Sequence, residues 1–201
     1  MAFINPRTKE IQAKIVYYGP GRGGKTTNLE WIYSHFRSRI QSDIVSLKTS
    51  GDRTIFFDFL PMEVGKIFGH KVRVQLYTVP GQIKYNATRK LVLRGADGIV
   101  FVADSMTAVR KKNLHSLKNL HENLKSYRRS IFKVPLVLQY NKVDLAEQGI
   151  PITPFEVMQK DLNTQLKVPA FKASALTGLN VTQTLKKITE LTMLSIRKHL
   201  E

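Results

Sequence analysis

The hydrophobic positions along the chain follow two spacings, one typical of strands and one typical of helices. Continuous or alternating apolar runs predict strands at 11–18, 54–60, 72–76, 98–103, 134–140 and 169–173. Apolar residues at helical spacing predict helices within 29–40, 114–127, 155–166 and 180–199. This alternation indicates an α/β fold, with a mostly parallel sheet and helices on both faces. Ligands of such sheets bind at the carboxyl ends of the strands.

Length and composition narrow the class of protein. A chain of 201 residues with 42% hydrophobic residues is expected to form one domain over 1–201. It has no cysteine, which excludes disulfides, thiolate metal sites and attachment of prenyl or palmitoyl groups. Position 2 is Ala2, so myristoylation is not expected either. Without a long apolar run, the sequence predicts a cytoplasmic protein with no lipid anchor and no membrane-spanning segment.

The positive charge is large and unevenly distributed. The formal net charge is +17, and the predicted helix within 110–129 carries seven basic residues against one acid, Glu122. The basic residues are Arg110, Lys111, Lys112, Lys118, Lys125, Arg128 and Arg129. Two interpretations stay open: a solvated helix face, or a face that contacts anionic lipid, nucleic acid or an acidic protein.

The stretch GPGRGGKTT at 19–27 satisfies two phosphate-binding patterns at once. As G-x-G-x-x-G it favours a dinucleotide, with Asp43 at a spacing suited to the ribose. As G-x-x-x-x-G-K-[ST] it favours a nucleoside triphosphate, because Lys25 then reaches the β- and γ-phosphates and the Thr26 hydroxyl binds Mg²⁺. Only the second interpretation explains the Lys-Thr pair, so the sequence predicts a P-loop NTPase and makes Asp43 an ordinary polar residue.

A second motif follows the predicted strand at 134–140. In QYNKVDL, the Asp144 carboxylate is suited to accept from the N1–H and exocyclic amine of guanine, a pair of donors that adenine lacks. Asn141 would tether the loop to neighbouring backbone, and the stem of Lys142 would cover the base. We therefore expect a guanine nucleotide.

These motifs resemble those of Ras-type small GTPases, and more closely those of the bacterial MglA family. The similarity extends through KIVYYGPG, GKTTNL, DRTIFFDFLP, LYTVPGQ, GADGIVFVADS, QYNKVDL and TGLNVTQTLK, in order and spacing. It implies a GTP/GDP switch in cell polarity and motility that hydrolyses GTP slowly unaided. It also implies Mg²⁺, a roadblock-type activating protein, polarity effectors and recruitment to a cell pole.

The resemblance also implies the roles of individual residues. Gln82 would orient the attacking water, Arg53 would act as an intrinsic arginine finger beside Lys25, and Thr54 would join Thr26 on Mg²⁺. The nucleotide-binding residues implied are Gly19, Gly21, Gly23, Gly24, Lys25, Thr26, Thr27, Thr54, Gly81, Asn141, Lys142, Asp144, Ser174, Ala175 and Leu176. Gly21 is expected to leave room beside the γ-phosphate for Gln82 and Arg53.

Three positions depart from the general Ras pattern. Thr78 stands where Ras-like proteins have an aspartate near Mg²⁺, a feature shared with MglA-type proteins. Asp58 is a candidate replacement, although a polar strand position explains it equally well. Arg22 brings a charge into the glycine loop, where it would contact either a phosphate or a partner.

Two other functions remain as alternatives. A P-loop kinase for a small metabolite would prefer adenine and need an arginine-rich lid, which Asp144 and the short chain disfavour. An adaptor would bind anionic lipid or nucleic acid through the basic helix, with nucleotide serving only to stabilise the fold.

Overall fold

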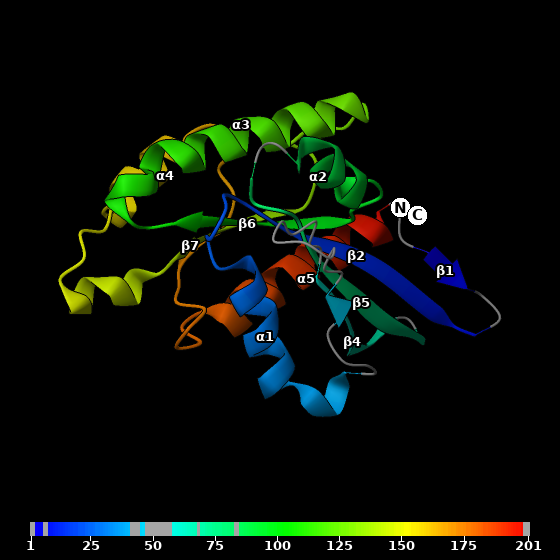
Figure 1. Cartoon of the computed structure of the whole chain (residues 1–201). Helices are drawn as coiled ribbons and strands as arrows, with labels where there is room; N and C mark the ends of the chain where they lie inside the picture. The colour runs from blue at the N-terminus through cyan, green and yellow to red at the C-terminus, as the bar shows by residue number, and fades with distance from the viewer. Residues whose placement is uncertain are drawn as a thin grey trace.

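One sheet organises the computed structural model, which describes residues 3–5, 8–40, 45–46, 58–67, 69–82 and 85–198 (Figure 1). Its strands are β1 (Phe3–Asn5), β2 (Glu10–Tyr18), β3 (Val45–Ser46), β4 (Asp58–Ile67), β5 (His70–Thr78), β6 (Gly98–Asp104), β7 (Leu136–Asn141) and β8 (Ala170–Lys172). They lie in the order β3-β4-β5-β2-β6-β7-β8, with β1 paired to β2. From β5 to β8 neighbouring strands are parallel, whereas β1, β3 and β4 pair antiparallel. The predicted, mostly parallel sheet is confirmed.

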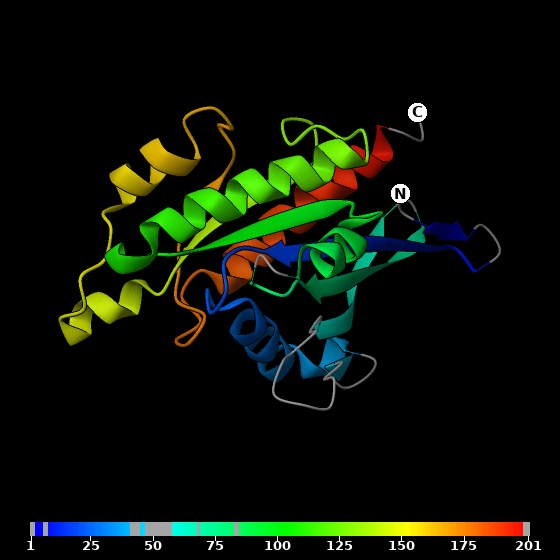
Figure 2. The same cartoon turned by 45° about the horizontal axis from the view of Figure 1, so that its top comes forward.

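Helices cover both faces of this sheet, as expected. They are α1 (Lys25–His35), α2 (Asn86–Leu93), α3 (Arg110–Ser126), α4 (Phe155–Leu162) and α5 (Val181–Arg197). α2, α3 and α4 lie on one face, and α1 and α5 on the other (Figures 1 and 2). Within the parts of the chain that the structure describes, no helix combines the length and apolarity needed to cross a membrane.

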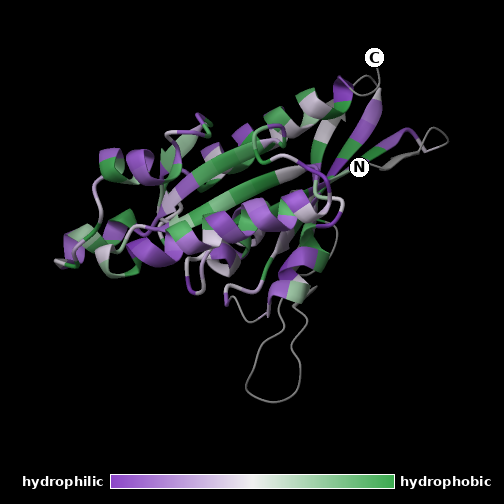
Figure 3. Cartoon of the chain, turned by 90° about the horizontal axis from the view of Figure 1, so that it is seen from above, coloured by the Kyte–Doolittle hydropathy of each residue, from purple (hydrophilic) through white to green (hydrophobic). Residues whose placement is uncertain are grey.

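Alternating residues of the strands fill two hydrophobic cores. Val16 and Tyr18 of β2 pack with Leu120 of α3, whereas Tyr17 packs on the opposite face with Leu29 of α1. This alternation is the period-two pattern of a strand, and burial on both faces explains why the central strands are almost wholly apolar. Figure 3 shows these hydrophobic strands between helices that carry many hydrophilic residues.

The β4–β5 hairpin differs from its predicted boundaries. The turn at Gly69 has φ +76, a left-handed conformation that glycine adopts readily. β4 continues to Ile67, which pairs with His70, so the predicted strand end at residue 60 was wrong. The predicted start at residue 54 lies outside the described residues, as does Asp43.

Three helices also differ from expectation, and the first is α1, which ends at His35 and not at residue 40. α2 was not predicted, because its buried residues are only Arg89, Val92 and Leu93, and two adjacent apolar positions beside an arginine do not stand out as a helical apolar pattern. α4 ends at Leu162 and not at residue 166. The Asn163 amide explains this end, because its Oδ1 accepts from Val168 N and its Nδ2 donates to Val168 O, which closes a loop.

The buried face of α3 is more polar than the leucine spacing predicted. Leu120 and Leu124 are buried, but Leu114 is 39% exposed. The remaining buried positions are polar: Asn113, Ser116, Asn119 and Asn123. α3 therefore contributes hydrogen-bonding side chains as well as hydrophobic contacts to the interior.

Candidate functional site

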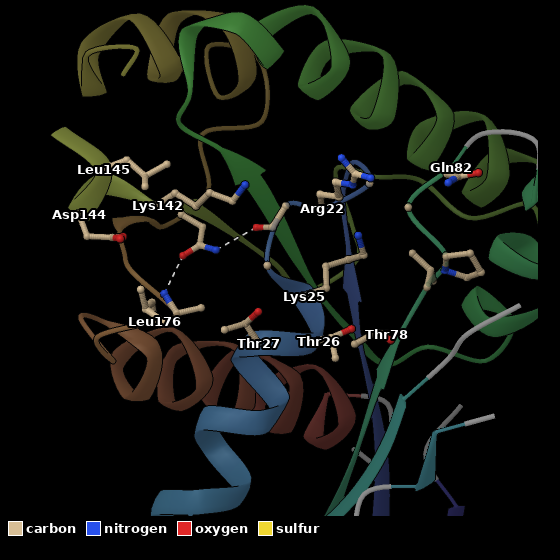
Figure 4. Close-up of a pocket in the computed structure, with 18 of the residues that line it drawn as sticks. Arg22, Lys25, Thr26, Thr27, Thr78, Gln82, Lys142, Asp144, Leu145 and Leu176 are labelled. Atoms are coloured by element: carbon tan, nitrogen blue, oxygen red, sulfur yellow. Dashed lines mark hydrogen bonds between the residues drawn. The ribbon is translucent and has the colours of Figure 1, made fainter. Parts of the chain in front are cut away.

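A cavity of about 900 Å³ opens where the parallel strands β2, β5 and β7 end (Figure 4). Most of the predicted site residues line it, namely Gly21, Gly23, Gly24, Lys25, Thr26, Thr27, Gly81, Gln82, Asn141, Lys142, Asp144, Ala175 and Leu176. Gly19 and Ser174 do not line the cavity. Arg53 and Thr54 lie outside the described residues. Segments far apart in the sequence thus form one pocket large enough for a nucleotide.

The glycines of the 19–27 loop allow close packing beneath this cavity. Gly24 has φ +92, and a Cβ there would overlap the Asn141 amide. Gly19 has φ +145, and a Cβ there would overlap the carbonyl oxygen of Val102. Both positions combine a conformation that favours glycine with a close backbone approach, so side chains at either would displace the loop.

The loop leads directly into the N-terminus of α1. Gly24 is the N-cap of the helix, and as a glycine it brings no side chain to cap the first N–H groups. Lys25 is buried, and its Nζ donates to Pro20 O at 2.6 Å and to Gly19 O at 3.3 Å, which holds a positive charge on the loop. Backbone donors at a helix N-terminus beside a lysine make an anion-binding site.

Asn141 joins three loops around the cavity. Its Nδ2 donates to Gly23 O at 2.9 Å, and its Oδ1 accepts from Ala175 N at 2.7 Å (Figure 4). The asparagine at the end of β7 therefore fixes the glycine loop relative to the 174–176 loop. This contact is the tether expected from the sequence.

Asp104 orients Lys142, a role that sequence reasoning missed. Lys142 Nζ lies 2.6 Å from Asp104 Oδ2, and the backbone of Asp104 exchanges two hydrogen bonds with the side chain of Asn113. The acid follows the buried run GIVFVA and so ends at the ligand edge of the sheet. The sequence did contain a signal for this role, because Asp104 comes one residue after a predicted parallel strand.

The carboxylate of Asp144 faces the cavity. Its Oδ1 is buried and has no hydrogen-bond partner within the described residues. Leu145 and the 72% exposed Leu176 line the same end of the cavity (Figure 4). A buried acceptor without a partner is costly, so this end of the pocket suits a flat ligand with N–H donors and apolar faces.

The loop that carries Gln82 packs against the glycine loop. A Cβ at Gly81 would overlap Gly21 Cα, whereas one at Gly21 would lie 3.6 Å from Gly81 C and 3.9 Å from Gln82 Cγ. The second pair of distances is ordinary contact. Gly21 is adjacent to Gln82 as expected, but in this arrangement the tight steric requirement falls on Gly81.

Arg89 of α2 supports this loop from the protein interior, and no sequence motif indicated this role. The side chain is fully buried, and the described residues provide it with no ion-pair partner. Arg89 donates to Tyr18 Oη at 3.1 Å, to Ser116 Oγ at 2.9 Å and to Gly81 O at 3.4 Å. Burial raises the pKa of Tyr18, an effect that Arg89 opposes. A buried cation thus links α2, α3 and the residue before Gln82.

We predict that Arg89→Met slows the GTP hydrolysis expected from the sequence about tenfold, because Gly81 O loses a charged donor. GDP affinity should change little, since Arg89 does not line the cavity. Single-turnover hydrolysis and GDP titration measure the two effects separately. Ser116→Ala is the matched control, because it removes an Arg89 acceptor remote from Gly81 and should leave hydrolysis unchanged. Equal loss of GDP affinity and hydrolysis in Arg89→Met would show general disruption of the fold instead.

The pocket offers hydroxyl groups, and few carboxylates, to a metal ion. Thr26 and the buried Thr78 line the cavity (Figure 4). Among the residues with described positions, no group of three His, Cys, Asp or Glu side chains is suited to hold a metal. Asp58 begins β4, but its side chain is outside the description. A cation here would have to take most of its ligands from a bound anion and from water.

Comparisons with known proteins agree with this geometry. The family model described as "Ras family" matches residues 14–193. The chain is 47% identical over 198 residues to "Mutual gliding-motility protein MglA" of Myxococcus xanthus, covering 98% of this chain and 99% of that protein. It is 30% identical over 189 residues to "Ypt/Rab-type GTPase YPT7" of Saccharomyces cerevisiae, covering 92% and 83% respectively. The chain therefore belongs to the Ras family of small GTPases.

Proposed function

We propose that this GTPase is a GTP/GDP switch in bacterial cell polarity or motility. The observation that carries the guanine assignment is that Asp144 lines the same cavity as the glycine loop and has a buried Oδ1 with no hydrogen-bond partner among the described residues. The 47% identity to a gliding-motility protein over nearly the whole of both chains supports the cellular role. We further propose that residues 1–201 form one domain.

Each wall of the cavity has its own part in nucleotide binding. The loop at 19–27 and the N-terminus of α1 hold the phosphates, with Lys25 as the principal charge. Asp144 accepts the two guanine N–H groups, and Lys142, held by Asp104, covers one face of the base. Gly19 and Ser174 act indirectly, because they shape the loops that carry these groups.

Hydrolysis transfers the γ-phosphoryl group to water. Gln82 orients the water, whose oxygen bonds to the γ-phosphorus as the bond to the β–γ bridging oxygen breaks. GDP leaves, and the water proton ends on inorganic phosphate. Lys25 and Arg53 stabilise the charge that develops on the transferred oxygens. The exposed position of Gln82 at the cavity rim suits this role.

The residues present fit Mg²⁺ bound together with nucleotide, as is general in Ras-like GTPases. Thr26, and Thr54 by resemblance, would supply hydroxyl ligands, and oxygens of the phosphates and of water would supply the others. The ion would neutralise charge on the β- and γ-phosphates. Thr78 stands on the cavity wall where Ras-like proteins usually have a carboxylate. The phosphates therefore become more important as ligands of the ion.

The proposed switch acts through partners. By resemblance these are a roadblock-type activating protein and polarity effectors, with recruitment from the cytoplasm to a cell pole. Residues 81–82 adjoin the phosphate loop, so loss of the γ-phosphate at hydrolysis would alter a surface that partners contact.

The basic helix supports a further contact with an anionic surface. Arg110 is engaged with Asp161, and Arg129 donates to Ala96 O at 2.5 Å. The other five basic side chains of the cluster are exposed: Lys111, Lys112, Lys118, Lys125 and Arg128. Charge reversal at Lys111, Lys112 and Arg128 tests this contact, and unchanged binding to anionic vesicles or nucleic acid would count against it.

Nucleotide binding tests the proposed function most directly. Titration with GTP, GDP and ATP, with and without Mg²⁺, should show strong preference for guanine nucleotides and tighter binding with Mg²⁺. Tight ATP binding would favour the kinase alternative. Nucleotide binding without any hydrolysis would favour the adaptor.

A further inference from the structure

Arg22 is the charged residue of the glycine loop that the preceding roles leave unexplained. Its side chain is exposed to solvent and lines the nucleotide cavity. In the view of Figure 4 it lies between Lys142 and Gln82. Arg22 therefore shares one cavity with Asp144 of the proposed guanine-binding loop and with Gln82, the proposed water-orienting residue.

The backbone at Arg22 favours glycine. Its φ is +61, in the left-handed region that side chains with a Cβ occupy at a cost. Gly23 N donates to Pro20 O at 3.4 Å, so residues 20–23 form a tight turn with Arg22 at its third position. The arginine thus occupies a place where glycine would fit with less strain, so replacement by glycine should leave the turn intact.

The charge of Arg22 has no counterion within the described chain. The structure gives it no hydrogen bond or ion pair there, whereas Lys142 is paired with Asp104 and Lys25 is bonded to loop carbonyls. Asp144, at the base end, is the one acid of the described cavity wall. A guanidinium without a partner at the edge of an anion site is suited to bind phosphate oxygens, where it can donate two hydrogen bonds.

We propose that Arg22 binds the phosphate chain of GDP and GTP and slows nucleotide release. This inference rests on the proposed guanine nucleotide site. It adds a second positively charged side chain, beyond Lys25, to the phosphate contacts. Because the loop holds phosphates that both nucleotides share, the effect extends to both. It is electrostatic, so it weakens as the salt concentration rises.

Arg22→Gly isolates the side chain, because glycine retains the left-handed turn without strain. The variant should release mant-GDP about tenfold faster than the wild type at low salt, with a smaller difference at high salt. Arg22→Lys should recover part of the slow release, because it retains the charge without the planar fork. The ratio of GDP to IDP affinity should not change, since Asp144 recognises the exocyclic amine.

Arg128→Gly is the matched control. Arg128 is also an exposed arginine with positive φ, +56, but it follows α3 and does not line the cavity. The control removes the same charge and the same strain, so it should release mant-GDP at the wild-type rate.

Three results would overturn the inference: equal release from Arg22→Gly and wild type, equal acceleration in Arg128→Gly, or a changed GDP-to-IDP ratio. Equal release of mant-GDP would indicate that Arg22 contacts a protein partner and not the phosphates. A wild-type protein that binds no guanine nucleotide would overturn the proposed function itself, an outcome that the wild-type titration identifies separately.

Discussion

Asp144→Asn is expected to lower the affinity for GDP by about 10³-fold and to create affinity for XDP. The buried Asp144 Oδ1 has no partner inside the described chain, and guanine brings two donors to this carboxylate. Xanthine has a carbonyl in place of the exocyclic amine. An asparagine amide can donate to that carbonyl, whereas an aspartate would face it with an unpaired negative charge.

Displacement of bound mant-GDP by GDP, XDP and ADP measures this change in base preference. Glu147→Gln is the matched control, because Glu147 is an exposed acid of the same segment, η4 (Val143–Gln148), and does not line the cavity. The control should bind GDP like the wild type. If Asp144→Asn kept full GDP affinity, this residue would not recognise the base.

Gln82→Leu is expected to slow GTP hydrolysis on the order of 10²-fold while nucleotide affinity stays within about twofold. Leucine keeps the size of the side chain but cannot orient water. Because Gln82 is exposed at the cavity rim, the fold should tolerate the change. Single-turnover release of phosphate from bound GTP measures the rate, and mant-GDP titration measures the affinity.

Gln165→Leu provides the control, since Gln165 is exposed and does not line this cavity. Arg53→Ala is the companion variant, with an expected loss on the order of 10³-fold if the side chain acts as an intrinsic finger. Wild-type hydrolysis in both Gln82→Leu and Arg53→Ala would contradict the proposed mechanism.

Local patterns were sufficient to predict most of the fold. The strands at 98–103 and 134–140 were predicted because burial on both faces requires continuous apolar residues, a property visible in one segment. The phosphate and guanine loops were equally visible, since their chemistry depends on residue types at short fixed spacings. α2 was missed because one of its three buried residues is Arg89, which a search for apolar spacing does not count.

The sequence by itself determined the fold class, the phosphate loop and the residues expected to recognise guanine. The tertiary structure decided which of them form the cavity wall, with Gly19 and Ser174 behind it and Arg22 on it. It also decided the support of the site by Asp104 and Arg89. These contacts join residues from different elements, such as Lys142 with Asp104 and Arg89 with Gly81. Spacing along the chain holds no information on such pairs, because only packing of the helices on the sheet brings them together.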